Sequence, residues 1–103
     1  MAMPIGYVVT PGDTAVHNLL TLIFGADNTV VDFPASEVTI SAPATNAGTV
    51  YLNSTNAVSS SNYSEALTAG SSHTYRSQNK TTANQFWLVL SNSADKLVFE
   101  RII

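Results

Sequence analysis

The stretch at residues 85–103 constrains the fold more than any other part of this chain. Residues 86–90 form an unbroken apolar run, residues 91–95 form a polar cluster, and residues 96–102 are again largely apolar. Two short runs of aromatic and β-branched residues on either side of a polar turn predict a β-hairpin. Because the first run has no polar position, we expect it to be a central strand that is covered on both faces.

Five apolar side chains of these two runs are predicted to anchor the core: Phe86, Trp87, Leu88, Leu97 and Phe99. Trp87 is the only tryptophan, and its position inside a wholly apolar run places it in the core. A helix over residues 86–90 is the alternative. It is disfavoured because the run is short, contains aromatic and β-branched residues, and ends at a Ser-Asn-Ser sequence.

The first half of the chain contains a clear alternating segment. Residues 37–42 place Val38, Ile40 and Ala42 on one face, which predicts a strand with one face on the core and the other in water. Turn residues recur about every eight to twelve positions, which predicts an all-β fold, an antiparallel β-sandwich or jelly roll of about eight short strands. One short helix within residues 14–24 stays open as an alternative, since apolar residues there also fit a helical stripe.

The length and composition predict one domain with an unusual surface. The 103 residues suffice for one core, and we expect a single β-sandwich domain over residues 7–103 after an extended N-terminal arm over residues 1–6. Only 11% of residues are charged, against about 25% in an average protein. Ser, Thr and Asn replace them, and neutral polar groups cost less to desolvate than ions. Such a surface favours assembly with other protein subunits, because little free energy is lost when it is removed from water.

Several partners and compartments are disfavoured. The net charge of −3 argues against nucleic acid, because phosphate backbones are bound mainly by Lys and Arg. No cysteine is present, which excludes disulfides and thiolate metal sites. The N-terminal residues lack the features of a signal peptide, and the apolar stretch at residues 19–24 is far shorter than the roughly 20 residues of a membrane span. We expect synthesis in a cytoplasm and no membrane partner.

Patterns for catalysis and metal binding are also missing from the sequence. His17 and His73 are the only imidazoles, and nothing in the spacing brings them together with Asp13 or Glu65. The sequence contains no Gly-x-Ser-x-Gly motif and no partnered carboxylates within an apolar run. We therefore predict a protein that is not an enzyme and that uses no metal or cofactor.

Aromatic residues leave a binding function open. Trp87, Tyr51, Tyr63 and Tyr75 are of the kind that form a sugar-binding platform on a β-sandwich, because their rings combine a large apolar face with a polar group. Trp87 is assigned to the core. Tyr63 and Tyr75 lie beside polar loops and are the candidate glycan contacts.

Several turn and strand motifs follow one another over residues 44–103. They are the turn Asn46-Ala47-Gly48, the strand Thr49-Val50-Tyr51-Leu52, the short strand Ala57-Val58-Ser59, the corner Leu67-Thr68-Ala69-Gly70 and the aromatic strand Phe86-Trp87-Leu88-Val89. We expect Gly70 to adopt a positive φ. Followed by a final hairpin, this order resembles a pattern in small structural proteins of tailed bacteriophages.

The resemblance implies a virion protein of the capsid decoration (cement) type. Such a protein is a non-enzymatic β-sandwich or jelly roll on the outer capsid surface, commonly a homotrimer, that bridges and stabilises subunits of the major capsid protein. Met3, Ile5 and Tyr7 of the N-terminal arm are then the expected capsid contacts, because an arm can pair along a neighbour's strand. The alternatives are a tail, baseplate or head-fibre subunit, or a carbohydrate-binding module for host attachment that uses Tyr63 and Tyr75.

Overall fold

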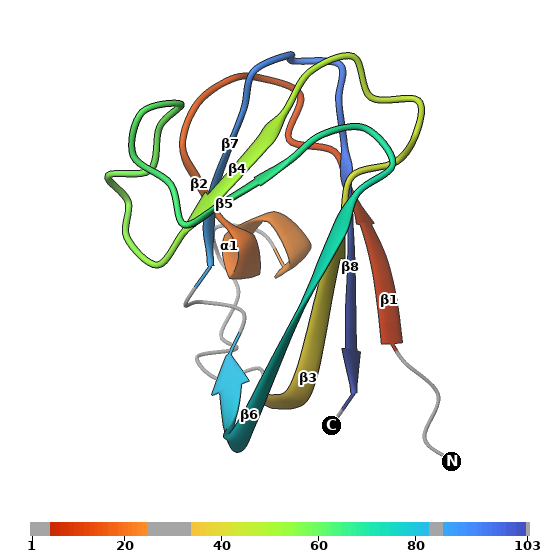
Figure 1. Ribbon diagram of the computed structural model, residues 1–103, viewed down its shortest axis with the longest axis vertical. Coiled ribbons are helices and arrows are strands. Elements are labelled where there is room, and N and C mark those ends of the chain that lie inside the picture. Colours follow the sequence, from red (N-terminus) through yellow and green to blue (C-terminus); the bar gives the residue numbers. More distant parts are fainter. Residues whose placement is uncertain (1–4, 25–33, 83–85, 103) are drawn as a thin grey trace.

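The computed structural model describes residues 5–24, 34–82 and 86–102, and these form a sandwich of two four-stranded antiparallel sheets (Figure 1). The predicted fold class is confirmed. The first sheet has the order β1-β8-β3-β6, with strands Ile5–Val9, Leu97–Ile102, Pro34–Ser41 and Ser72–Thr82. The second has the order β2-β7-β4-β5, with strands His17–Asn18, Trp87–Leu90, Val50–Asn53 and Glu65–Leu67.

A single short helix, α1 (Leu19–Phe24), follows β2 directly and lies within the segment where a helix was the alternative. Asn18 precedes the helix and accepts a hydrogen bond from the Thr21 backbone N–H at 3.4 Å, which is the geometry of an N-cap. Leu19 is fully buried, and Leu22 and Ile23 pack against the core. The helix therefore contributes its apolar stripe to the space between the sheets.

The alternating strand appears as predicted in β3, where Val38 and Ile40 are fully buried. The strand is longer than the alternating segment at residues 37–42, because it begins at Pro34. Proline is tolerated at the first residue of a strand. The register of the pairing with β6 shifts between Ala35 and Glu37, as at a β-bulge.

The polar sequence after Tyr75 favours a loop over residues 77–84, but the structure continues β6 as a strand to Thr82. The segment lacks the alternation of apolar and polar residues that predicts a strand. β6 lies at the edge of the first sheet and pairs only with β3. A polar sequence can take this position because strand pairing uses main-chain hydrogen bonds, which every residue type except proline can donate.

The predicted C-terminal hairpin is also wrong. β7 belongs to the second sheet and β8 to the first, so the connection at residues 91–96 carries the chain from one layer to the other. Both runs are strands, and a turn does separate them, but their pairing partners are β4 and β3 rather than each other. Local patterning identifies strands, whereas two apolar strands gain more by covering opposite sides of one core.

Strand β7 is central, between β2 and β4, but only one of its faces is covered. Leu88 and Leu90 are buried, whereas Trp87 and Val89 are half-buried on the outer face. The assignment of Trp87 to the core is therefore wrong. The two-layer sandwich places no third layer over this face in the described part of the chain, so strict alternation decides which residues are covered.

The core occupies the space between the inner faces of the two sheets. The other four predicted anchors, Phe86, Leu88, Leu97 and Phe99, are buried there. The remaining members of the buried cluster come from both sheets and from α1: Val9, Leu19, Val38, Ile40, Ala42, Val50, Leu52, Leu67 and Leu90.

Hydrogen bonds join two loops at the end of the sandwich that lies away from the chain termini (Figure 1). We call residues 46–48 and 91–96 the loop junction. Asp95 is 5% exposed and accepts hydrogen bonds from the backbone N–H groups of Ala47 and Gly48 at 2.8 and 2.7 Å. Asn46 is 8% exposed, donates to the Lys96 carbonyl oxygen at 2.7 Å and accepts from the Lys96 N–H at 3.1 Å.

Gly48 completes the loop junction through its lack of a side chain. A Cβ at this position would collide with the Ser91 Oγ and come within 3.2 Å of the Asp95 carboxylate. The Ser91 hydroxyl in turn accepts the Thr49 N–H at 2.8 Å. The junction thus joins the loop before β4 to the connection between the two sheets, and all the hydrogen bonds just described satisfy groups that the turns would otherwise leave unpaired.

Candidate functional site

The outer face of the second sheet brings together aromatic and apolar side chains from two adjacent strands and a loop. Tyr51 of β4 lies opposite Val89 of β7, and Asn53 lies opposite Trp87. Residues opposite each other in an antiparallel pair point to the same side, and the partners Leu52 and Leu88 are buried. Tyr51, Tyr63, Trp87 and Val89 form what we call the aromatic face.

Tyr63 joins this face from the loop between β4 and β5. Its ring centroid lies 5.1 Å from that of Tyr51 at an interplanar angle of 45°, and the residue is 47% exposed. The tilted arrangement is one of the favourable geometries of aromatic pairs. Tyr63 therefore stands above the sheet as the most accessible ring of the face.

Hydrogen bonds hold the loop that carries Tyr63. The Ser64 N–H donates to the Leu52 carbonyl oxygen at 2.8 Å, and the Asn62 side-chain amide donates to the Ala57 carbonyl oxygen at 2.9 Å. Ser59 and Asn62 exchange two backbone hydrogen bonds. Such internal bonding lowers the entropy that would be lost when a ligand or partner covers the ring.

The aromatic face is also free of charged side chains at its described sheet positions. The outward residues of the second sheet are Asn18, Tyr51, Asn53, Ala66, Trp87 and Val89. All of them are half-buried. The cost of removing such a face from water is low because no ion has to be desolvated.

The two tyrosines predicted as a glycan site do not come together. Tyr75 lies on β6 of the other sheet, packs against the core and has its ring centroid 5.1 Å from that of Phe86. Burial, and next the nearby carboxylate of Glu65, raise the pKa of Tyr75 above its ordinary value. The structure thus assigns Tyr75 to the margin of the core, and it groups Tyr63 with Tyr51 and Trp87 instead.

The expected capsid-contact arm is a strand in its described part. Met3 lies outside the described residues, whereas Ile5 and Gly6 begin β1 and pair with β8. Tyr7 is half-buried against the core, with its ring centroid 6.2 Å from that of Phe99. Tyr7 is therefore mainly a packing residue, and the outward position of this strand is held by Val8, which is 66% exposed.

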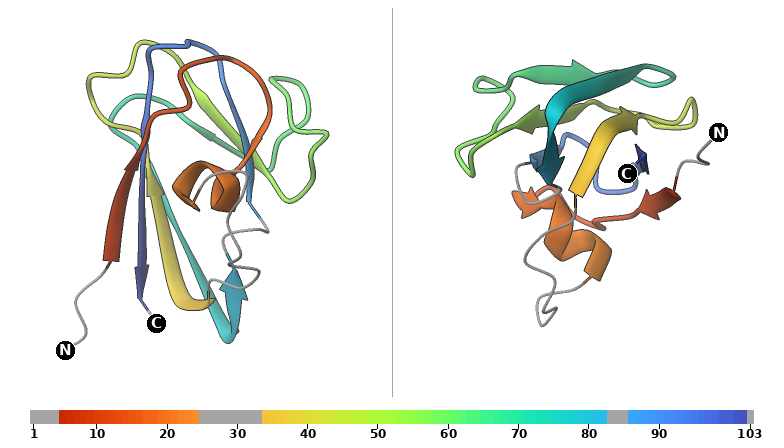
Figure 2. Two further views of the ribbon diagram at one scale, coloured as in Figure 1. Left: turned by 180° about the vertical axis from the view of Figure 1, so that it is seen from behind. Right: turned by 90° about the horizontal axis from the view of Figure 1, so that it is seen from below.

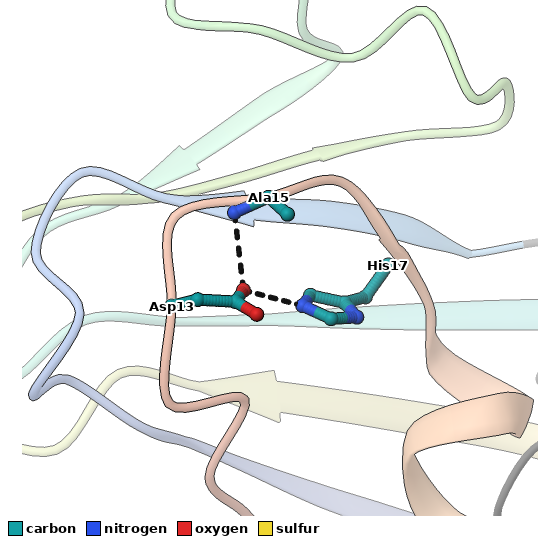
Figure 3. A network of polar contacts seen from close by, with 3 residues as sticks. All are labelled: Asp13, Ala15 and His17. Atoms are coloured by element: carbon teal, nitrogen blue, oxygen red, sulfur yellow. Dashed lines mark hydrogen bonds and ion pairs between the residues drawn. The ribbon is translucent and has the colours of Figure 1, made fainter.

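Two histidines form separate acid–base pairs. His17 Nε2 lies 2.6 Å from Asp13 Oδ1, which also accepts the Ala15 N–H at 3.1 Å (Figure 3). The hydrogen bond with His17, followed by that with Ala15, lowers the pKa of the exposed Asp13 carboxyl. On the other side of the sandwich, His73 Nδ1 lies 3.4 Å from Glu65 Oε2, which links the edge strands of the two sheets.

Neither acid–base pair extends into a larger cluster. Within residues 5–24, 34–82 and 86–102, no group of three His, Asp or Glu side chains is placed to hold a metal ion. The same residues contain no helix long and apolar enough to cross a membrane. The aromatic face is therefore the best-developed candidate site of the described chain.

Sequence reasoning named the residues of this face but grouped them incorrectly. Trp87 was assigned to the core because its neighbours on both sides are apolar. The strand period could have predicted its outward position. Side chains alternate between the two faces of a strand, so Leu88 and Leu90 cannot face the same side as Trp87. Comparison of the chain with protein-family models, curated proteins and solved structures finds no match.

Proposed function

We propose that the protein is a non-enzymatic virion structural protein, an outer capsid decoration protein that bridges and stabilises subunits of the major capsid protein. The observation that carries the proposal is the uncharged aromatic face on the second sheet. A rigid sheet with three large rings on one outer side is suited to docking against a protein surface. The motif order over residues 44–103 and the low content of charged residues support the same function.

The expected strength of such docking depends on the surface area that the three rings can bury. A large aromatic side chain buries about 150–250 Å² when it passes from full exposure to full burial, and Tyr51 and Trp87 are already half-buried on the sheet. Tyr51, Tyr63 and Trp87 together supply a modest contact, below the roughly 800 Å² per partner of a stable interface. Binding to a capsid lattice would therefore draw on several contacts per molecule, with the capsid protein and with neighbouring copies, which act together as one multivalent attachment.

Copy number in purified virus particles tests the structural function. Quantitative mass spectrometry should find this chain in a simple ratio to the major capsid protein, because only lattice positions are that numerous. A handful of copies per particle would instead indicate a tail, baseplate or head-fibre subunit. Absence from the particle would refute a virion function.

Variants of the aromatic face test the proposed contact. Trp87→Ala and Tyr51→Ala should each lower the occupancy of the chain on capsids that are reconstituted with purified protein. Val16→Ser is the matched control, because Val16 is 40% exposed and lies outside the aromatic face. If folded Trp87 and Tyr51 variants decorate capsids as well as the unmodified protein, the aromatic face is not the contact.

Glycan binding is the second candidate, and the tilted pair of Tyr51 and Tyr63 beside Trp87 favours it. Rings with a polar edge, flanked by the amide of Asn53, match the mixed apolar and hydroxyl surface of a neutral sugar. Under this function Tyr63→Ala abolishes binding on a glycan array, whereas Tyr75→Phe does not. No binding by the unmodified protein would remove this candidate.

A further inference from the structure

The four edge strands of the sandwich differ in how they are protected against pairing with another chain. β2 and β5 contain only two and three residues. β6 is long, but His73, Arg76 and Lys80 lie in its sequence. Short edges and basic residues are the usual means by which proteins discourage strand pairing.

β1 has neither protection. Its five residues, Ile-Gly-Tyr-Val-Val, include no charged residue and no proline. It pairs with β8 on one side and, as the edge strand of the first sheet, with no other described strand (Figures 1 and 2), although the short helix α1 also contacts it. Val8 points outward and, at 66%, is the most exposed large hydrophobic residue of the described chain. An open apolar edge of this length is a template for strand addition.

We propose that β1 is a self-association strand through which two copies of this chain form a dimer. The two β1 strands pair antiparallel about Tyr7, so that the four-stranded first sheets of both copies join into one continuous sheet. Each Val8 then lies opposite Gly6 of the second copy, and Ile5 lies opposite Val9. The pairing is isologous, since the same strand serves on both sides.

The outer face of β1 is complementary to itself in this register. Within one copy Val8 lies beside Val98, and Gly6 lies beside Glu100. A Cβ added at Gly6 would lie 3.6 Å from the Glu100 Cγ, so the position of the missing side chain borders the aliphatic stem of Glu100. Val8 of the second copy can occupy the outer side of this gap, and each exposed Val8 is thereby covered twice, by Val98 of its own chain and by the Glu100 stem of the other.

Charge does not oppose the arrangement. The charged residues of β8, Glu100 and Arg101, lie one strand away from the pairing edge. The two Glu100 residues fall in different rows of the joined sheet, with both β1 strands between them. Like charges are destabilising when they lie directly opposite each other, and this register avoids that contact.

The dimer should be weak, because five residue pairs bury less than the roughly 1,200 Å² of total surface typical of stable interfaces. Its test is therefore the concentration dependence of molar mass up to about 1 mM protein, by light scattering on a size-exclusion column and by sedimentation equilibrium. We expect a shift from the protomer mass of 10.9 kDa to twice that value. Self-association requires no capsid, so it can fail or succeed independently of the proposed function.

Two substitutions locate the interface. Val8→Lys places an ammonium group at the open edge and should raise the dissociation constant at least about tenfold. Val16→Lys adds the same charge at the other strongly exposed valine and should leave it unchanged. Thermal unfolding of both variants checks that the protomer is intact, as expected for exposed positions.

A spin label at position 8 tests the register. The chain has no cysteine, so Val8→Cys provides a single thiol for a nitroxide. In the proposed pairing the two positions 8 are diagonal neighbours, with backbones about 7–8 Å apart, and the spectrum should show strong dipolar broadening. Excess unlabelled protein should remove the broadening if it arises between copies.

A dimer that is weakened by Val8→Lys and shows dipolar broadening supports the proposal. A monomer at all concentrations overturns it, and so does a trimer, because two-fold strand pairing cannot produce three-fold order. A dimer that is insensitive to Val8→Lys, or one without broadening at position 8, also overturns it by placing the interface elsewhere.

Discussion

The loop junction and the aromatic face reverse the usual distribution of side chains. At the loop junction a carboxylate, Asp95, and an amide, Asn46, are almost completely buried. On the aromatic face the only tryptophan of the chain, Trp87, remains half-exposed beside Tyr51. Polarity by itself therefore predicts burial poorly at these two places.

The two regions differ in the physical reason for the burial or exposure of their side chains. Both Asp95 oxygens accept backbone N–H groups, so burial of the charge is compensated by charge-assisted hydrogen bonds. Trp87 follows the strict alternation of β7, and its outward position is imposed by the burial of Leu88. We expect the loop junction to govern stability and the aromatic face to govern binding, and the following substitutions test this division.

Within these two regions, the largest expected effect on stability comes from Asp95→Ala. It leaves the N–H groups of Ala47 and Gly48 without their acceptor in a buried place, and we expect a loss of about 3 kcal/mol in the free energy of unfolding. Urea denaturation measures it. Asp13→Ala, at an exposed carboxylate, should leave the same quantity nearly unchanged. Equal effects of the two substitutions would show that the junction does not carry stability.

Gly48→Ala should be next in size. The new Cβ collides with the Ser91 Oγ, and we expect a cost of about 1–3 kcal/mol, measured by the same denaturation. The double variant Gly48→Ala/Ser91→Ala should cost less than the sum of its single variants, because it removes both partners of the collision. Gly6→Ala is the control, since its Cβ meets Glu100 only at 3.6 Å. Strictly additive effects at positions 48 and 91 would contradict the proposed close contact.

Trp87→Ala should have a smaller effect on stability and a larger one on binding. A half-exposed ring loses less on truncation than a buried one, and we expect about 1 kcal/mol, against about 3–5 kcal/mol for Phe99→Ala in the core. Denaturation supplies both values, and capsid decoration or glycan binding by the folded Trp87 variant supplies the second readout. A stability loss as large as that of the Phe99 variant would assign Trp87 to the core after all.

The smallest effect concerns pH at the Asp13–His17 pair. The lowered pKa of Asp13 means that this carboxyl contributes stability above its unfolded pKa, and that the contribution is lost as the pH falls through its folded pKa. Carbon-detected NMR titration should show Asp13 ionising below the ordinary range of aspartate. His17→Ala should raise this pKa, because the hydrogen bond with His17 is the main cause of the shift. An unchanged titration in the variant would exclude that cause.

The sequence by itself determined the class of the fold and several of its local features. Strict alternation at residues 37–42 predicted the buried face of β3, and the corner at Gly70 was expected to need a positive φ, which is 83° in the structure. Phe86 and Phe99 were expected in the core and are buried there. These features depend on nearest neighbours along the chain, namely strand period and backbone sterics.

The tertiary structure alone decided which strands pair and which outer face carries the rings. β7 and β8 look like a hairpin in sequence, but each finds its partners in a different sheet. Asp95 is buried because the loop at residues 46–48 reaches it, and Trp87 faces outward because the sandwich has only two layers there in the described chain. The candidate site could be predicted in its residue types only, because contacts between residues far apart in sequence are set by packing of the whole core and not by local pattern.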